Sequence, residues 1–217
     1  MNIRLKKTAG IWAVAFSALT FGSAMTAQAD IVVLEGVNNQ GTTNVLLTDA
    51  TDVATVTGTV GPAGPVINFT STSGGGLLSA PSSGQARVSG GGGNDPFSQL
   101  TFALASGDMF TRAVFNINAG TDGTVTFDVL GLDISGSGQS FAVDANGENF
   151  FTITAINDQL ISSISLSGSA GATFEDVRQV RVGGVVSAIP EPETYALMLA
   201  GLGAVGFMAR RRKQKQS

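Results

Sequence analysis

Short stretches in which apolar and polar residues alternate run through residues 30–187. Residues 124–130 read TVTFDVL, so the apolar side chains fall on one side of an extended chain and the threonines and Asp128 on the other. This period of two predicts a strand with one buried face. The same reasoning predicts strands at residues 31–35, 43–48, 53–60, 66–70, 99–105, 110–117, 139–143, 150–156, 160–166 and 175–182.

Two dipeptides between these segments favour tight turns. Asp122-Gly123 precedes residues 124–130, and Asn146-Gly147 precedes residues 150–156. Both tolerate the positive φ angles of two-residue hairpins, so each is expected to join two neighbouring strands. The sequence therefore predicts an all-β body, residues 30–187, folded as an antiparallel, jelly-roll-like β-sandwich of about eleven or twelve strands.

Residues 71–96 differ from the rest of the body. They contain eight glycines and many serines. This composition predicts a long, mobile Gly/Ser-rich loop with one short strand near residues 85–89.

The amino terminus has the order of a secretory signal peptide. Basic residues open the chain, residues 9–25 carry no charge, and Ala27 and Ala29 form an A-x-A site. We expect residues 1–29 to be removed by cleavage before Asp30. The alternative is a retained membrane anchor.

The carboxyl terminus repeats this order in reverse. Residues 195–209 are uncharged, and a basic run and a basic tail, residues 210–217, follow them. A helix of that length spans roughly 22 Å, which is shorter than the ~30 Å hydrocarbon core of a membrane. The uncharged run therefore predicts a short transmembrane helix whose basic end stays in the cytoplasm. A buried core helix is the alternative. The basic stop consists of Arg210, Arg211, Arg212 and Lys213.

The linker between the body and this helix, residues 188–194, contains Pro190, Glu191 and Pro192. Pro-Glu-Pro, then a short apolar run, then an arginine cluster at the terminus resembles a PEP-CTERM sorting tail. The resemblance implies an inner-membrane-anchored precursor that an exosortase, a membrane-embedded enzyme, cleaves near Pro-Glu-Pro. It also implies delivery to the cell surface or extracellular matrix of a bacterium that makes exopolysaccharide.

Charge and composition narrow what the body can do. Between residues 30 and 189 there are four arginines, no lysine and fourteen carboxylates, a net charge of −10. Such a surface repels phosphate backbones, so no nucleic-acid partner is expected. The chain has no Cys and no His, which excludes disulfides, thiol or imidazole catalysis and ordinary zinc sites. We expect no enzyme, no catalytic residue and no bound cofactor.

Calcium is the one metal left open. Residues 144–149 (DANGEN) place oxygen ligands at alternate positions, but a simple turn accounts for them better than a calcium loop does. Arg178 and Arg181 are expected to form salt bridges with neighbouring acids. Loose calcium candidates elsewhere are Asp30, Glu35, Asp49, Asp108, Glu175 and Asp176.

A carbohydrate site is the other alternative. The body has no Trp or Tyr to stack on sugar rings, so any contact with sugars would be polar. Thr55, Thr57 and Thr59 form a single T-x-T-x-T row of the kind found on ice-binding faces, but one row makes no array.

These observations favour a non-enzymatic exported surface or matrix protein associated with exopolysaccharide and biofilm. The alternatives are a carbohydrate- or calcium-binding β-sandwich module and, last, a hydrolase.

Overall fold

The computed structural model describes residues 31–73, 76–81, 86–93, 95–132, 134–145, 147–169, 171–187 and 198–202. Within these residues the body is all-β, as predicted. Its strands are β1 (Ile31–Glu35), β2 (Thr42–Leu47), β3 (Ala50–Val53), β4 (Thr55–Val60), β5 (Val66–Thr70), β6 (Leu78–Ala80), β7 (Arg87–Gly90), β8 (Gln99–Leu104), β9 (Arg112–Ala119), β10 (Gly123–Leu132), β11 (Ile134–Val143), β12 (Asn149–Ala155), β13 (Leu160–Ser169) and β14 (Phe174–Gly183).

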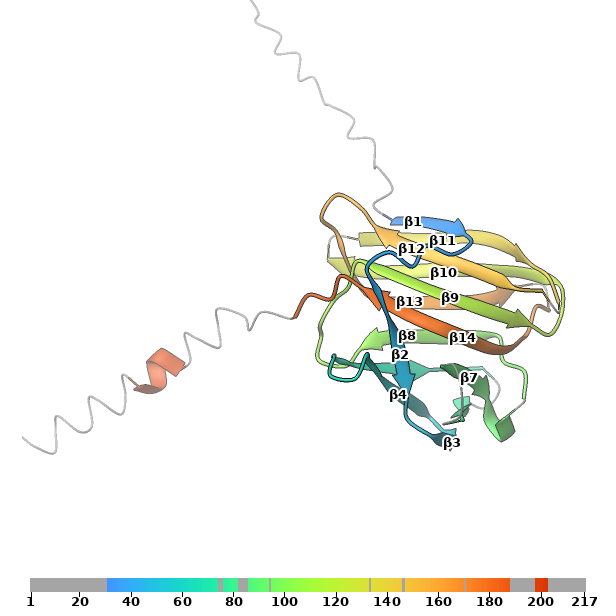
Figure 1. Ribbon diagram of the computed structural model, residues 1–217, viewed down its shortest axis with the longest axis horizontal. Coiled ribbons are helices and arrows are strands. Elements are labelled where there is room, and N and C mark those ends of the chain that lie inside the picture. Colours follow the sequence, from blue (N-terminus) through green and yellow to red (C-terminus); the bar gives the residue numbers. More distant parts are fainter. Residues whose placement is uncertain are drawn as a thin grey trace, which may run out of the picture.

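The strands form two layers that lie face to face (Figure 1). Sheet A has the order β1-β12-β9-β14, and the far edge of β14 is shared by β7 and β2, with β6 and β3 beyond β7. Sheet B has the order β4-β5-β8-β13-β10-β11. All of these strand pairs are antiparallel.

Strand β2 joins the two layers. Its first half pairs with β14 of sheet A, and its second half pairs with β4 of sheet B. At the opposite side the edge strands β1 and β11 approach each other, where the Gln139 Nε2 atom donates a hydrogen bond of 3.3 Å to the Ile31 carbonyl. The body is therefore a sandwich that is nearly closed into a barrel.

Phenylalanines from both layers fill the core. Phe115 of sheet A meets Phe127 of sheet B at a centroid distance of 5.8 Å, and Phe127 meets Phe151 of β12 at 4.9 Å. Aromatic pairs at such distances and tilts add to the free energy of area burial. Every buried apolar side chain among the described residues lies between Ile31 and Val182, so the body contains its own core.

The two predicted hairpins are wrong. Strand β9 belongs to sheet A and β10 to sheet B, and β11 and β12 likewise lie in different layers. The physical reason is local: neither Gly123 nor Gly147 takes the positive φ that a tight hairpin turn needs. Both segments instead cross between the layers, and the Asp122 carboxylate accepts a hydrogen bond of 2.6 Å from the Ala145 N–H, which ties the two crossings together.

The Gly/Ser-rich segment also differs from expectation. It contains two strands, β6 and β7, where the sequence predicts one, followed by a short 3-10 turn, η2 (Gly91–Gly93). Leu78, Ala80 and Val88 of this segment are buried in the common core. The described part of residues 71–96 is thus integrated into sheet A. The predicted strand 53–60 is divided as well, since Ala54 separates β3 from β4.

The two predicted membrane-directed ends fall largely outside the described residues. The signal peptide, residues 1–29, lies outside them, as does the basic tail, residues 210–217. Of the predicted transmembrane helix, residues 198–202 are described and are helical. No helix within the described part of the chain is long and apolar enough to cross a membrane.

Candidate functional site: a hydroxyl face on sheet B

The outer side of sheet B carries Ser or Thr on every one of its six strands. Core residues such as Val56, Phe102 and Leu166 point inward, so their sequence neighbours point outward. We call the outward hydroxyl residues the hydroxyl face: Thr55, Thr57 and Thr59 of β4, Thr70 of β5, Thr101 of β8, Thr124 and Thr126 of β10, Ser140 of β11, and Ser163, Ser165 and Ser167 of β13.

Strand register aligns these residues into rows across the sheet. The longest row follows successive register pairs across β4, β5, β8 and β13 and ends on β10: Thr55, Thr70, Thr101, Ser165 and Asp128. Neighbouring strands lie about 4.8 Å apart, so hydroxyls in a row are adjacent. Thr101 and Ser165 share a hydrogen bond of 2.8 Å between their hydroxyl oxygens, and Thr126 and Ser140 share another of 2.8 Å.

The hydroxyl face is almost uncharged. Asp128, opposite Ser165, is the one charged residue among the described side chains on the outer side of sheet B. The arginines of the body all lie on sheet A, where β7, β9 and β14 carry them: Arg87, Arg112, Arg178 and Arg181. The two layers therefore present surfaces of different chemistry: sheet A carries the four arginines, and the outer side of sheet B is almost uncharged.

Each hydroxyl of this face can both donate and accept a hydrogen bond. The side chains are short, and each is exposed or half-buried, so they lose little rotamer entropy on contact with a ligand. The sequence alone shows Thr55, Thr57 and Thr59 along one strand, but it does not show the array across the six strands. Every strand of sheet B contains at least one serine or threonine, yet only the pairing register shows that they are neighbours.

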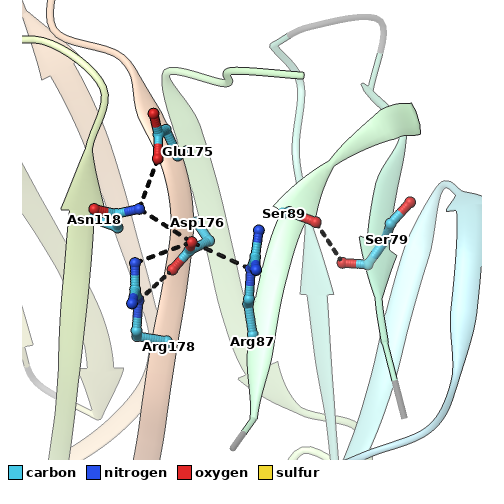
Figure 2. A network of polar contacts seen from close by, with 7 residues as sticks. All are labelled: Ser79, Arg87, Ser89, Asn118, Glu175, Asp176 and Arg178. Carbon is cyan, nitrogen blue, oxygen red and sulfur yellow. Dashed lines mark hydrogen bonds and ion pairs between the residues drawn. The ribbon is translucent and has the colours of Figure 1, made fainter. Parts of the chain in front are cut away.

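The strongest charged cluster lies on the outer side of sheet A, around Asp176 (Figure 2). Asp176 is only 1% exposed. Its carboxylate accepts a hydrogen bond of 2.7 Å from the Arg178 Nε atom, and its Oδ2 atom lies 3.2 Å from the Arg87 Nε atom. A bulge in β14 leaves Glu175 unpaired beside it, so the Asn118 amide donates to Glu175 at 2.8 Å and to Asp176 at 3.2 Å.

This cluster answers two predictions from the sequence. The salt-bridging role of Arg178 is confirmed, whereas Arg181 lies beyond a second irregularity in β14, opposite Asn44 and Val114. The calcium candidates Glu175 and Asp176 do lie together, but two guanidinium groups already occupy the positions around Asp176 where a cation would sit. Arg87 and Asn118, which complete the cluster, come from strands whose register the sequence does not reveal.

The other calcium candidates do not assemble into a site. Within the described residues no group of three or more acidic side chains is arranged to hold a metal ion. Glu35 ends β1, Asp49 precedes β3 and Asp108 lies between β8 and β9, while Asp30 is outside the described residues. In the 144–149 segment, the Asn149 side chain bonds to the Asp144 N–H and carbonyl, each at 3.0 Å, so these described residues form a hydrogen-bonded turn.

The predicted sorting residues lie outside the described part of the chain. These are the signal-cleavage residues Ala27, Ala29 and Asp30, the linker residues Pro190, Glu191 and Pro192, and the basic stop Arg210, Arg211, Arg212 and Lys213. Their assignment rests on the sequence.

Comparisons with known proteins bear on the tail and hardly on the body. No curated protein sequence matches this chain. Among solved structures, a family 29 carbohydrate-binding module from Piromyces equi is similar at 10% identity and a TM-score of 0.29, over 71% of this chain and 91% of that one. A superposition of that quality carries no argument about fold or function.

The sequence profile of the PEP-CTERM protein-sorting motif matches residues 188–213. That range begins directly after the last described residue of the body, Ser187, and ends at the last residue of the basic stop. The motif implies an exported precursor that is processed by an exosortase, which is a membrane enzyme. The chain is therefore a protein that carries a PEP-CTERM sorting motif at its carboxyl end.

Proposed function

We propose that this is a non-enzymatic exported protein whose β-sandwich serves as a structural or adhesive module at the cell surface or in the exopolysaccharide matrix of a biofilm. The observation that carries the proposal is that a body with its own core ends just before the sorting motif. Val186 exchanges hydrogen bonds of 2.8 and 2.9 Å with Met109, and the matched motif begins at residue 188.

The proposal includes a route. Residues 1–29 act as a signal peptide, residues 195–209 hold the precursor in the inner membrane, and the enzyme cuts near Pro190, Glu191 and Pro192. From β8 to β14 the chain crosses between the two layers at every connection except the one from β10 to β11, and these crossings support a jelly-roll-like assignment for the body that is delivered.

The basic stop provides the test of this route. Replacing Arg210, Arg211, Arg212 and Lys213 by Ser or Gln removes the charges that hold the end of a short apolar segment on the cytoplasmic side. We expect the variant to be processed and delivered poorly in a host with the exosortase, as measured by cell fractionation and mass. The thermal melt of the body should be unchanged. Normal processing and delivery of the variant would contradict the proposed route.

Calcium binding is the less favoured function of the body, because the guanidinium groups of Arg87 and Arg178 already form ion pairs with the buried carboxylate of Asp176. We expect calcium or EDTA, each at millimolar concentration, to leave the melting temperature of the purified body unchanged. A rise with calcium that EDTA reverses would restore a calcium-binding module as the better description.

Carbohydrate binding is the second candidate function, and the hydroxyl face specifically favours it. The face offers many hydrogen-bonding groups and little charge, and it is not covered by any described segment of the chain. Polar contacts of this kind fit a polymer of hydroxyl groups.

A further inference from the structure

We propose that the hydroxyl face of sheet B binds neutral polysaccharide chains, which lie across its strands. This inference deepens the proposed function, since it names the partner of an exported matrix protein and the surface that meets it. Three features support it: the chemistry of the face, the charge of the body and the irregularity of the strands beneath the face.

The first step concerns hydrogen bonding. A hydroxyl that loses water without gaining a partner is costly, so a ligand for this face must itself present donors and acceptors at high density. A polysaccharide chain does so along its whole length. The row from Thr55 through Thr70 and Thr101 to Ser165 offers a matching series on four neighbouring strands.

The second step concerns charge. The body carries a net charge of −10, so it repels polyanionic polysaccharides over the range of a Debye length. Asp128, at the end of the longest row, adds a local negative charge to the face, and no described arginine lies on the strands of sheet B to offset it. A neutral polymer avoids this repulsion.

The irregularity of the strands and the charge of Asp128 favour a flexible polymer over two other partners, ice and a second copy of the chain. Ice requires a regular repeat, but the pairing of β10 is irregular between Phe127 and Val129 and between Leu130 and Gly131. Asn68 and Ala103 also interrupt the hydroxyl rows, as do the exposed apolar side chains of Val66, opposite Thr59, and Leu130, opposite Ser163. A second copy of the chain would bring two Asp128 carboxylates toward the same interface. A polysaccharide can follow a twisted, interrupted surface.

The expected binding is weak at each contact. The face has no described aromatic side chain to stack on a sugar ring, and a typical hydrogen bond adds little net free energy in water. Retention in a matrix then depends on multivalency: many copies of the protein bind many repeats of the same polymer, and together they bind more tightly than any single contact does.

The experiment is affinity electrophoresis of the purified body, residues 30–187, through gels containing dextran, hydroxyethylcellulose or galactomannan, with alginate as the polyanion. The test variant is Thr55→Val/Thr70→Val, which removes two exposed, register-paired hydroxyls without changing charge or shape. The matched control is Thr43→Val/Thr51→Val, which changes exposed threonines of β2 and β3 outside the hydroxyl face.

We expect at least one neutral polymer to retard the body and alginate to leave it unaffected. The test variant should bind about tenfold more weakly, which corresponds to the loss of two hydrogen bonds, and the control should bind like the original. Unchanged melting temperatures would confirm that all forms are folded.

Several results would overturn the inference. No retardation by any neutral polymer, equal retardation by alginate, or equal losses in test and control variants would each do so. If the original body forms a dimer on size-exclusion chromatography and the test variant is a monomer, the face binds a second copy of the chain. If the original body shapes ice crystals and the test variant does not, the face binds ice. Failure here leaves export unaffected, because fractionation of the full chain measures export separately.

Discussion

At the scale of single residues, Asp176 shows how this acidic body tolerates a buried charge. A lone carboxylate would be expensive to remove from water, but two arginines and one amide surround this one. The sequence predicts a salt bridge for Arg178 from its neighbours in the chain. It does not predict Arg87 or Asn118, because these residues reach Asp176 only through the pairing of β14 with β7 and β9.

Two arginines of β14 form a matched test of this cluster. Arg178→Met leaves Asp176 buried with a single guanidinium, so we expect a loss of about 2 kcal/mol in the free energy of unfolding. Arg181→Met, beyond the bulge, should change it by less than about 0.5 kcal/mol. Urea denaturation of both variants measures the difference. Equal losses would mean that the Arg178–Asp176 pair does not stabilise the body.

At the scale of elements, two adjacent leucines at the start of β6 test whether the Gly/Ser-rich segment is part of the core. Leu78 is fully buried, whereas Leu77 is 42% exposed. Leu78→Ala should therefore cost about 3 kcal/mol through lost burial and a cavity, and Leu77→Ala less than about 0.5 kcal/mol. If residues 71–96 were the mobile loop that their composition suggests, the two substitutions would have the same small effect in chemical denaturation.

The strands themselves were largely predictable, but their partners were not. Residues 31–35 and 66–70 have the predicted bounds, because each is a short run rich in apolar and β-branched residues, with Gly36 after the first and Pro65 before the second. The alternation of apolar and polar residues in strands such as residues 124–130 indicates which side of a strand is buried. It contains no information about which layer the strand joins. For this reason the sequence predicts hairpins at Gly123 and Gly147 where the chain crosses between the layers, and it does not show that the separate rows form one hydroxyl face.

At the scale of the whole molecule, processing should change the near-ultraviolet absorbance of the protein. Trp12 and Tyr195 are its only tryptophan and tyrosine, and each lies in a segment that the proposed route removes. The released body should therefore show phenylalanine absorbance alone, measured on material whose mass identifies its ends. Tyrosine absorbance in the released form would place the cut after Tyr195.

The central position of β14 has a mechanical consequence. Strand β14 leads into the carboxyl-terminal linker and is flanked by β9 on one edge and by β7 and β2 on the other. A load applied through that linker acts along the strand, so hydrogen bonds on both edges share the force. Strand β1, at the other terminus, is an edge strand that can peel away bond by bond. We therefore expect the body to resist tension applied at its carboxyl end better than tension applied at its amino end.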